Sequence, residues 1–430
     1  MLIRTKGDFT RTVPMPRRRA NAVVQLPGKC QKKAEALELD SAQLARGVLL
    51  VGASRTGKSV QQGKMISQIR RQMSSRDVLI ILDTKGEYAK NFYRPGDVIL
   101  GTNGPHPQTD GWNLMRDCTA GCKTQSDLSQ RIEMIASRIF WQKNNNVPYF
   151  TDAPRRVLEV LLETLLRHPD LLPEGEVLDN HGLMAFLQRG DYDRFIACSS
   201  APAEMRSYIG TSKNRNPTER SVLAELLINV RMQLCGAWGA HGNFCLVQFE
   251  TNRKGKTLFL QYDLRDGGAS DPVYQLLIDL LLTGLMNGQN SDGKFYLFLD
   301  EIHLLGKSPQ ILEKALNYGP GIGLGTICIG TQSLSQLEEL SGDAGMNTLL
   351  SGLQTRIMFR TEDRTSRDFV REQCGSVRTT QLQYIPGISY NAQDGAYEPA
   401  VSDIELSFME VGQAIVKLPE YPAFFFQFDQ

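Results

Sequence analysis

The residues with the clearest chemistry are eight consecutive positions that form a phosphate-binding pattern: Gly52, Ala53, Ser54, Arg55, Thr56, Gly57, Lys58 and Ser59. They read G-x-x-x-x-G-K-S, follow the apolar run 48–51 and precede a helix-forming segment, 61–73. In such a loop, consecutive backbone N–H groups and the positive end of the helix hold the β-phosphate. The lysine reaches the β- and γ-phosphate oxygens, and the serine hydroxyl ligates Mg²⁺. A glycine-rich turn with a chance Lys-Ser is the alternative, but the flanking pattern favours nucleoside triphosphate binding.

A second motif is the pair Asp300-Glu301, which follows the apolar strand predicted at 295–299. In P-loop ATPases the first acid helps to hold Mg²⁺ and the second polarises the attacking water. Two acids in this position are also typical of a helix N-terminus, where the helix dipole favours them. Downstream of a phosphate loop we interpret them as catalytic.

Two further strand ends carry polar side chains. Gln332 follows the strand predicted at 326–330, where it would sense the γ-phosphate; a loop glutamine that caps the next helix is the alternative. Asp83 ends the strand predicted at 78–82 and is followed by Lys85 and Glu87. Because parallel sheets bind ligands at the carboxyl ends of their strands, we expect Asp83 to lie near Mg²⁺, unless this is merely a charged turn.

The pattern of elements predicts an α/β protein with a mainly parallel sheet. Strands and helices alternate over 35–117 and 243–430, which we expect to form one nucleotide-binding domain, including a strand at 245–250. Between them, residues 118–242 show helical patterns without strands and predict an all-α domain. The first 34 residues form a basic leader: residues 1–33 hold nine Lys or Arg against one acid, Asp8. Such an arm would contact DNA or an anionic membrane, or remain a solvated tail.

Composition narrows the class of protein. The chain has 430 residues, a formal net charge of +1 and eight scattered cysteines, which we expect to be reduced thiols rather than disulfides or zinc ligands. No apolar run reaches the roughly 18 residues that a membrane span needs, and no signal peptide is apparent. We expect a cytoplasmic protein, carried to the inner face of the cell membrane only through a partner.

Five segments together resemble a known family: GASRTGKS, DTKGEY, Trp112-Asn113, FLDEIHLLGKSPQILEKAL and GTQSLSQL. They are similar to the type IV coupling proteins, the TraD/TraG-type ATPases of bacterial conjugation and type IV secretion. The closing stretch 403–422 fits the same pattern, and the likeness covers about 45–115 and 245–425. The resemblance implies a RecA-like P-loop core with an all-α insertion.

The resemblance also implies an activity. Members act as hexameric, ATP- and Mg²⁺-dependent motors that present relaxase-bound single-stranded DNA to a secretion channel. Lys58 and Ser59 would bind nucleotide and Mg²⁺, Asp300 would be the Walker B acid, Glu301 the catalytic base and Gln332 the sensor. Two alternatives stay open: a FtsK/HerA-type pump for double-stranded DNA, and an ATP-switched adaptor that recruits secretion substrates.

The chain departs from the family in two respects. Members normally begin with transmembrane helices, so we expect a form that lacks this segment and uses a separate membrane anchor, with the leader as a docking arm. They also carry an arginine finger where this chain has Pro320. A downstream arginine (Arg356, Arg360 or Arg364) would replace it, or hydrolysis is slow. Lys213 and Arg215, in a loop of the helical block, are candidate DNA contacts or simply solvated.

Overall fold

The computed structural model describes residues 3–4, 13–16, 21–101, 108–140, 148–252, 254–262, 268, 270–286, 293–305, 310–385 and 388–430. Of residues 3–4, 310 and 378–397 it describes the backbone alone. The chain forms two compact units. The first comprises Met1–Leu79, Ser291–His303 and Leu312–Gln430, and the second comprises Ile80–Asn290 and Leu304–Ile311.

The first unit is built on a sheet whose strands follow the order β3 (Lys33–Asp40), β2 (Ala22–Cys30), β14 (Phe424–Phe428), β13 (Gln413–Lys417), β10 (Thr355–Phe359), β4 (Val48–Val51), β9 (Leu324–Thr331) and β8 (Phe295–Leu299). The last four run parallel to one another, and the others pair antiparallel. Every residue of β4 and β9 is buried, as expected for parallel strands covered on both faces.

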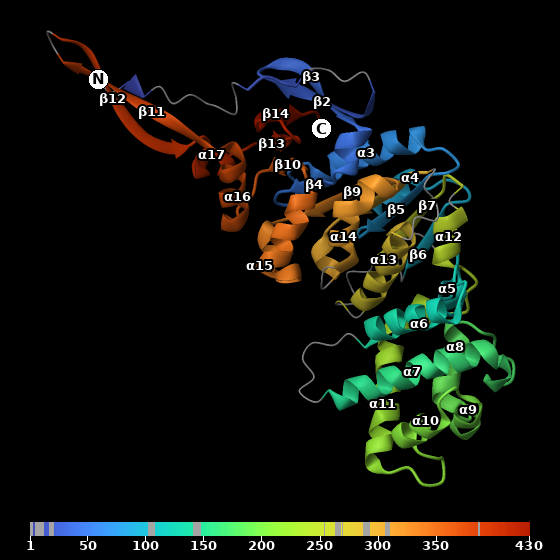
Figure 1. Cartoon of the computed structure of the whole chain (residues 1–430). Helices are drawn as coiled ribbons and strands as arrows, with labels where there is room; N and C mark the ends of the chain where they lie inside the picture. The colour runs from blue at the N-terminus through green and yellow to red at the C-terminus, as the bar shows by residue number, and fades with distance from the viewer. Residues whose placement is uncertain are drawn as a thin grey trace. The chain divides into compact units, whose positions relative to one another are not determined.

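Helices connect and cover these strands (Figure 1). They are α2 (Ser41–Ala45), α3 (Lys58–Gln72), α14 (Gln310–Tyr318), η5 (Gly319–Ile322), α15 (Leu334–Gly352), α16 (Arg364–Cys374) and α17 (Asp403–Ser407). The side-chain amide of Gln68 fixes α3 to β2, because it accepts from Gln25 N–H at 2.8 Å and donates to Gln25 O at 2.9 Å. Helix α15 is kinked at Gly342, which has φ 71° and ψ 169°.

A second, three-stranded sheet in the first unit consists of β1 (Ile3–Arg4), β11 (Ser376–Ile385) and β12 (Ile388–Pro399). Strands β11 and β12 form a long antiparallel hairpin, visible in Figure 1. Strand β1 pairs with β11, so that Arg4 lies opposite Gln381. Part of the basic leader is therefore a strand.

The second unit combines a small sheet with most of the helices. Its strands follow the order β5 (Val78–Asp83, from Ile80 onward), β7 (Thr257–Gln261) and β6 (Val98–Gly101), with β6 and β7 parallel. The helices are α4 (Glu87–Phe92), α5 (Leu114–Thr119), α6 (Gln125–Ile139), α7 (Tyr149–Arg167), η1 (Pro169–Leu171), α8 (Asn180–Arg189), α9 (Tyr192–Cys198), α10 (Pro202–Ile209), α11 (Pro217–Gln233), η2 (Gly236–Gly239), α12 (Leu246–Asn252), α13 (Asp271–Met286) and the second half of η4 (Ile302–Leu305, from Leu304 onward). As predicted, the described residues between 124 and 238 contain helices and no strands.

Aromatic packing and the side chain of Asn113 join the helical block to the rest of the second unit. The ring of Trp238 packs edge-on against both Trp112 and Tyr274, with centroids 6.0 and 5.3 Å apart. Asn113 caps α5 and donates to Leu178 O and Gly242 O at 3.2 and 3.0 Å. The Trp112-Asn113 motif therefore has a structural role at this junction.

The structure corrects two local predictions. The segment predicted as a strand at 245–250 is helix α12, because Asp117 accepts the Val247 N–H at 2.9 Å and so caps the start of that helix. Residues 22–30 of the predicted leader form β2, which pairs with β14 and β3. The boundary predicted at residue 34 thus falls inside a β-hairpin. The predicted boundaries of an all-α domain, 118–242, stay a prediction, since the second unit extends beyond them on both sides.

Two expectations from composition concern thiols and membrane spans. All eight cysteines are free, as predicted, and five of them are buried. Burial raises the pKa of the Cys245 and Cys374 thiols to about 12, which keeps them protonated and unreactive. Among the described residues, no helix combines the length and the apolar character needed to cross a bilayer.

Candidate nucleotide-binding site

The ends of three neighbouring parallel strands bring the predicted motifs together in the first unit. Strand β9 lies between β4 and β8, with Val51 opposite Thr331 and Leu299 opposite Ile329. The chain continues from β4 into the phosphate loop, from β8 into Asp300-Glu301 and from β9 into Gln332. The sheet therefore places all three sequence motifs along one edge, where such sheets bind ligands.

The phosphate loop has a backbone that glycine makes possible. Gly57, which precedes α3, has φ 113°, and a Cβ on Gly52 would lie 2.6 Å from the Cβ of Phe359. Backbone bonds fix the start of the loop, since Gly52 N–H donates to Thr331 O at 3.3 Å and Ala53 N–H donates to Arg360 O at 2.8 Å. The loop is thus held by the two strands that flank β4.

Lys58 is buried within this loop, with 5% of its surface exposed. Its ammonium group donates to Gly52 O and, at 3.1 Å, to Ala53 O. Backbone carbonyls carry only partial charges, so a phosphate is a stronger partner for the ammonium. Ser59, the second residue of α3, is half-buried beside it. The position of Lys58 fits the nucleotide-binding role predicted from the motif, and the Mg²⁺-binding role of Ser59 stays a prediction.

Asp300 is buried, with 3% of its surface exposed, directly after β8. Across the neighbouring strand, a Cβ on Gly330 would lie 3.1 Å from Asp300 Oδ1 and 3.4 Å from Gln62 Oε1. The glycine therefore leaves room for the carboxylate between β8, β9 and α3. A buried carboxylate at this position fits a Mg²⁺ ligand, because hard cations favour oxygen donors.

Glu301 and Gln332 are in direct contact. The amide Nε2 of Gln332 donates to Glu301 Oε1 at 3.1 Å, and Glu301 has 7% of its surface exposed. The second oxygen, Oε2, is buried and accepts no hydrogen bond from the described residues. A carboxylate with one oxygen held and the other without a donor has the arrangement of a base that awaits a water molecule.

His303 is a further residue of this site that the sequence reasoning missed. Its Nδ1 lies 3.5 Å from Glu301 Oε2. Burial lowers the pKa of His303 below its ordinary value, although the neighbouring Glu301 opposes this shift. The imidazole next to the proposed base is therefore neutral at pH 7. Its position two residues after Glu301 was the only signal in the sequence.

Asp83 lies in the second unit, at the end of β5. It is fully buried, and its Oδ2 accepts the Ala89 N–H of α4 at 2.8 Å. Burial raises the pKa of Asp83, against the effect of the backbone donors. The carboxylate thus holds the turn that leads into α4, and its role near Mg²⁺ stays a prediction. Lys85 and Glu87 are exposed.

The candidate replacements for the missing arginine finger differ in their environment. Arg356 is held in place, because it donates to Leu353 O at 2.9 Å, to Leu350 O at 2.6 Å and to Gln373. Arg360 supplies the backbone oxygen that braces Ala53. Arg364 is the most exposed of the three, with 91% of its side chain accessible, and Pro320 is exposed as well.

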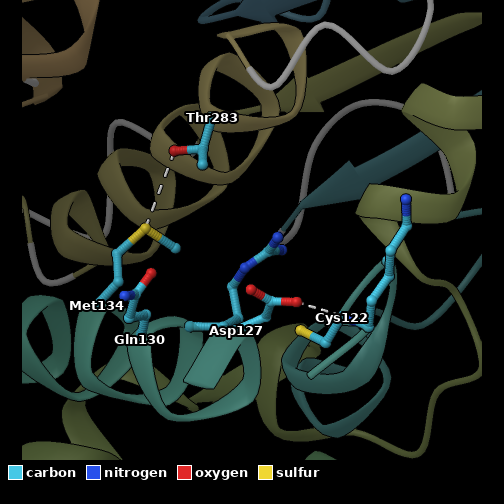
Figure 2. A pocket seen from close by; sticks show the side chains of 8 residues that line it. Cys122, Asp127, Gln130, Met134 and Thr283 are labelled. Carbon is cyan, nitrogen blue, oxygen red and sulfur yellow. Dashed lines mark hydrogen bonds between the residues drawn. The ribbon is translucent and has the colours of Figure 1, made fainter. Parts of the chain in front are cut away.

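The candidate DNA contacts and one cavity lie in the second unit. Arg215 donates to Ile209 O at 3.0 Å and packs 5.3 Å above the ring of Tyr192, whereas Lys213 is exposed. A cavity of about 520 Å³ has Cys122 and Asp127 among its lining residues. Figure 2 draws the side chains that line it. The cavity contains no residue of the nucleotide motifs.

A parallel sheet that carries a G-x-x-x-x-G-K-S loop after one strand and an Asp-Glu pair after another defines a P-loop nucleotide-binding protein with a RecA-like core. More particularly, the chain belongs to the family of the type IV secretion-system coupling protein DNA-binding domain, whose model matches residues 35–423. Both the fold and the family predicted from the motifs are confirmed.

Individual relatives agree with this assignment. The chain is 22% identical over 351 residues to coupling protein TraD of Escherichia coli (strain K12), a match that covers 76% of this chain and 43% of TraD. The chain thus spans less than half the length of this curated relative.

Solved structures support the fold. The bacterial conjugative coupling protein TrwBdeltaN70, in its unbound monoclinic form, has a TM-score of 0.72 at 18% identity and covers 98% of this chain and 91% of its own. VirB4 of Thermoanaerobacter pseudethanolicus has a TM-score of 0.59 at 12% identity and covers 97% and 98%. At these identities the likeness concerns the fold.

Proposed function

We propose that this chain is an ATP-hydrolysing motor that couples nucleotide turnover to the delivery of DNA into a conjugation or type IV secretion channel. The observation that carries the proposal is the contact between Glu301 and Gln332 at the edge where the phosphate loop also lies. A motor needs hydrolysis to move another part of the protein, and a sensor in contact with the base links the two.

The chemistry follows from the positions of the side chains. Lys58 would exchange its backbone oxygens for the β- and γ-phosphate oxygens. The Ser59 hydroxyl and Asp300 would hold Mg²⁺, which neutralises charge on the phosphates. Glu301 Oε2, which accepts no hydrogen bond from the part of the chain that the structure describes, would orient the attacking water. The hydrogen bond from Gln332 to Glu301 Oε1 would be kept or broken according to whether the γ-phosphate is present.

Related proteins supply the support for ATP and Mg²⁺ as ligands. TrwB, which shares the fold, has been solved with the ATP analogue ADPNP and with ADP and Mg²⁺. The remaining residues of the phosphate loop, from Gly52 to Gly57, would contact the phosphates through their backbone N–H groups. Asp83 would lie outside the direct ligand set.

The proposed partners follow from the family to which the chain belongs. We propose that the cargo is single-stranded DNA bound to a relaxase, and that components of the secretion channel form its path. We propose a homohexamer as the active assembly. Because Arg356 is bound to its own unit, the exposed Arg364 is the best candidate for an arginine that acts on a neighbouring subunit's nucleotide.

Mg²⁺-ATPase activity, measured without DNA and with single- or double-stranded DNA, tests the proposal. We expect single-stranded DNA to stimulate ATP turnover and to increase the mass of the protein in solution to that of a ring-shaped oligomer. We expect Lys58→Ala to reduce the ATPase rate by a factor of about 10² or more. Lys64→Ala, on the same helix, is the matched control. Preference for double-stranded DNA would favour a duplex pump. Tight ATP binding without DNA-stimulated turnover would favour an adaptor and contradict the motor.

A further inference from the structure

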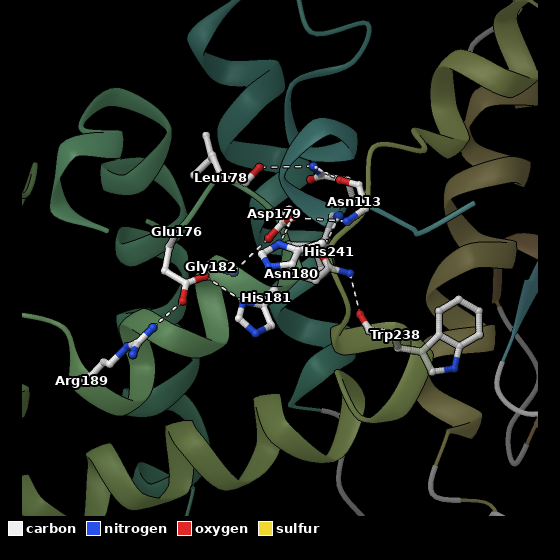
Figure 3. A network of polar contacts seen from close by, with 12 residues as sticks. Asn113, Glu176, Leu178, Asp179, Asn180, His181, Gly182, Arg189, Trp238 and His241 are labelled. Carbon is white, nitrogen blue, oxygen red and sulfur yellow. Dashed lines mark hydrogen bonds and ion pairs between the residues drawn. The ribbon is translucent and has the colours of Figure 1, made fainter. Parts of the chain in front are cut away.

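Two histidines and a glutamate of the second unit meet at the start of α8 (Figure 3). Glu176 precedes the helix, His181 lies in its first turn and His241 follows η2. One donor atom from each of the three lies within 4.8 Å of the other two. The rings of the two histidines pack with centroids 4.1 Å apart.

The carboxylate of Glu176 is fixed from both sides. Its Oε2 lies 2.7 Å from His181 Nδ1, and Arg189 binds its Oε1. A proton shared between an imidazole nitrogen and a carboxylate occupies the position that a cation would take.

His241 is oriented by a second carboxylate. Its Nδ1 lies 2.9 Å from Asp179 Oδ2, and only 3% of the Asp179 side chain is exposed. Asp179 is itself held by the N–H groups of Gly182, at 2.9 Å, and Gly242, at 3.2 Å. A carboxylate on one ring nitrogen leaves Nε2 of His241 as the ligand atom and fixes its direction, an arrangement common around protein metal ions.

We propose that Glu176, His181 and His241 bind one divalent transition-metal ion, with Zn²⁺ as the best match. Two imidazoles and one carboxylate suit zinc, and water completes a tetrahedral set. If the ion binds Nδ1 of His181, the proton that this nitrogen shares with Glu176 would move to Nε2 of the same ring. Because ligand atoms at about 2.0 Å from Zn²⁺ lie roughly 3.3 Å apart, the 2.7 Å pair must open slightly.

Both histidine side chains have room for this movement, since they are 46% and 57% exposed. The ion would join three chain segments: the loop before α8, its first turn, and the residues after η2. Asn180 already links the first turn of α8 to η2, the helix just before His241, by donating to Trp238 O at 2.8 Å. The proposed ion would therefore reinforce an existing junction, and its effect is on the stability of the helical block.

The test uses the full chain without an affinity tag, stripped of metal and nucleotide, titrated with Zn²⁺ by calorimetry and with Co²⁺ by visible absorption. We expect one site that His181→Gln and His241→Gln each weaken at least about tenfold, and that Asp179→Asn weakens by roughly 10–100-fold. His168→Gln is the matched control in the same unit. His303→Gln should bind the metal as wild type does, which would show that the histidine beside the Asp300-Glu301 motif does not contribute to the measured binding.

Absence of binding by the wild-type chain, or equal binding by His241→Gln, would overturn the proposal. If a variant fails to fold, wild-type protein still decides the question. Zn²⁺ should protect His181 and His241, but not His168, from diethylpyrocarbonate, as read by mass spectrometry. Equal modification with and without Zn²⁺ would contradict the site.

Discussion

Glu301 is the residue on which the proposed chemistry depends, and its backbone is unusual. It has φ 56°, in the left-handed region that residues other than glycine rarely adopt. Such a conformation costs about 1–3 kcal/mol and persists where the surroundings fix it. Here the bond from Gln332 and the burial of the carboxylate fix it. The strain is consistent with selection for the direction of the side chain rather than for stability.

His303 gives a prediction about pH. Because its folded pKa lies below the unfolded value, the unfolded chain takes up a proton first as the pH falls below about 6.5. The unfolding free energy should therefore decrease as the pH falls from 6.5 toward the folded pKa, and His303→Gln should flatten this decrease. Each unit of depression corresponds to about 1.4 kcal/mol.

Urea unfolding at pH 5 to 7.5 measures this effect, with His168→Gln as control. Identical pH profiles for wild type and His303→Gln would show that burial of this imidazole does not affect stability.

The sequence predicted some of these residues and not others for a physical reason. Lys58 and Ser59 belong to a local pattern in which eight adjacent residues form the whole loop. The contact of Glu301 with Gln332 joins residues 31 positions apart and depends on the register of β8 and β9. The sequence motifs pointed to both residues but could not show that their side chains are in contact. His303 becomes part of the site only because the folded chain buries it beside Glu301.

At the scale of elements, Gly330 illustrates how neighbouring strands shape the site. A methyl group there would lie 3.1 Å from Asp300 Oδ1, closer than ordinary contact. We expect Gly330→Ala to displace the carboxylate and raise the Mg²⁺ concentration for half-maximal ATPase activity about tenfold, equivalent to ~1.4 kcal/mol.

Gly321→Ala is the matched control, because no atom of the described residues lies within 4 Å of a Cβ at that position. A magnesium titration of the ATPase measures both variants. The same Mg²⁺ dependence in wild type and Gly330→Ala would mean that Asp300 is not confined by β9.

The misassigned segment at 245–250 shows where element prediction failed. Its apolar residues are compatible with a strand, but Asp117, at a separation of 130 residues, caps Val247 and starts a helix. Leu246 and Val247 are buried in either conformation, so hydrophobic pattern could not distinguish them. Helices α11 and α16 were predicted because their caps, Asn216 and Asp363, are local.

At the scale of the whole molecule, the proposed assembly requires a cation that crosses between subunits. Arg364 is a candidate for this cation because its side chain is exposed and can reach a neighbouring subunit. A trans-acting arginine increases the rate of hydrolysis by a factor of about 10³ or more. Arg364→Ala should therefore lose turnover while nucleotide affinity is kept. Arg367→Ala, on the same helix, should have a smaller effect.

A mixing experiment tests whether the residue acts in trans. Arg364→Ala carries an intact phosphate loop, and Glu301→Gln carries an intact Arg364, so their mixture should recover part of the ATPase activity. No recovery in mixed assemblies, with each variant shown to assemble, would count against a trans-acting Arg364.

The most direct test of the central claim compares nucleotide binding with hydrolysis in Glu301→Gln. If Glu301 is the base of an ATP-driven motor, the variant should bind ATP and Mg²⁺ as tightly as wild type. Its DNA-stimulated turnover should fall by about 10² or more, because the amide cannot accept a proton. Turnover equal to wild type, in a variant that binds ATP normally, would contradict the account.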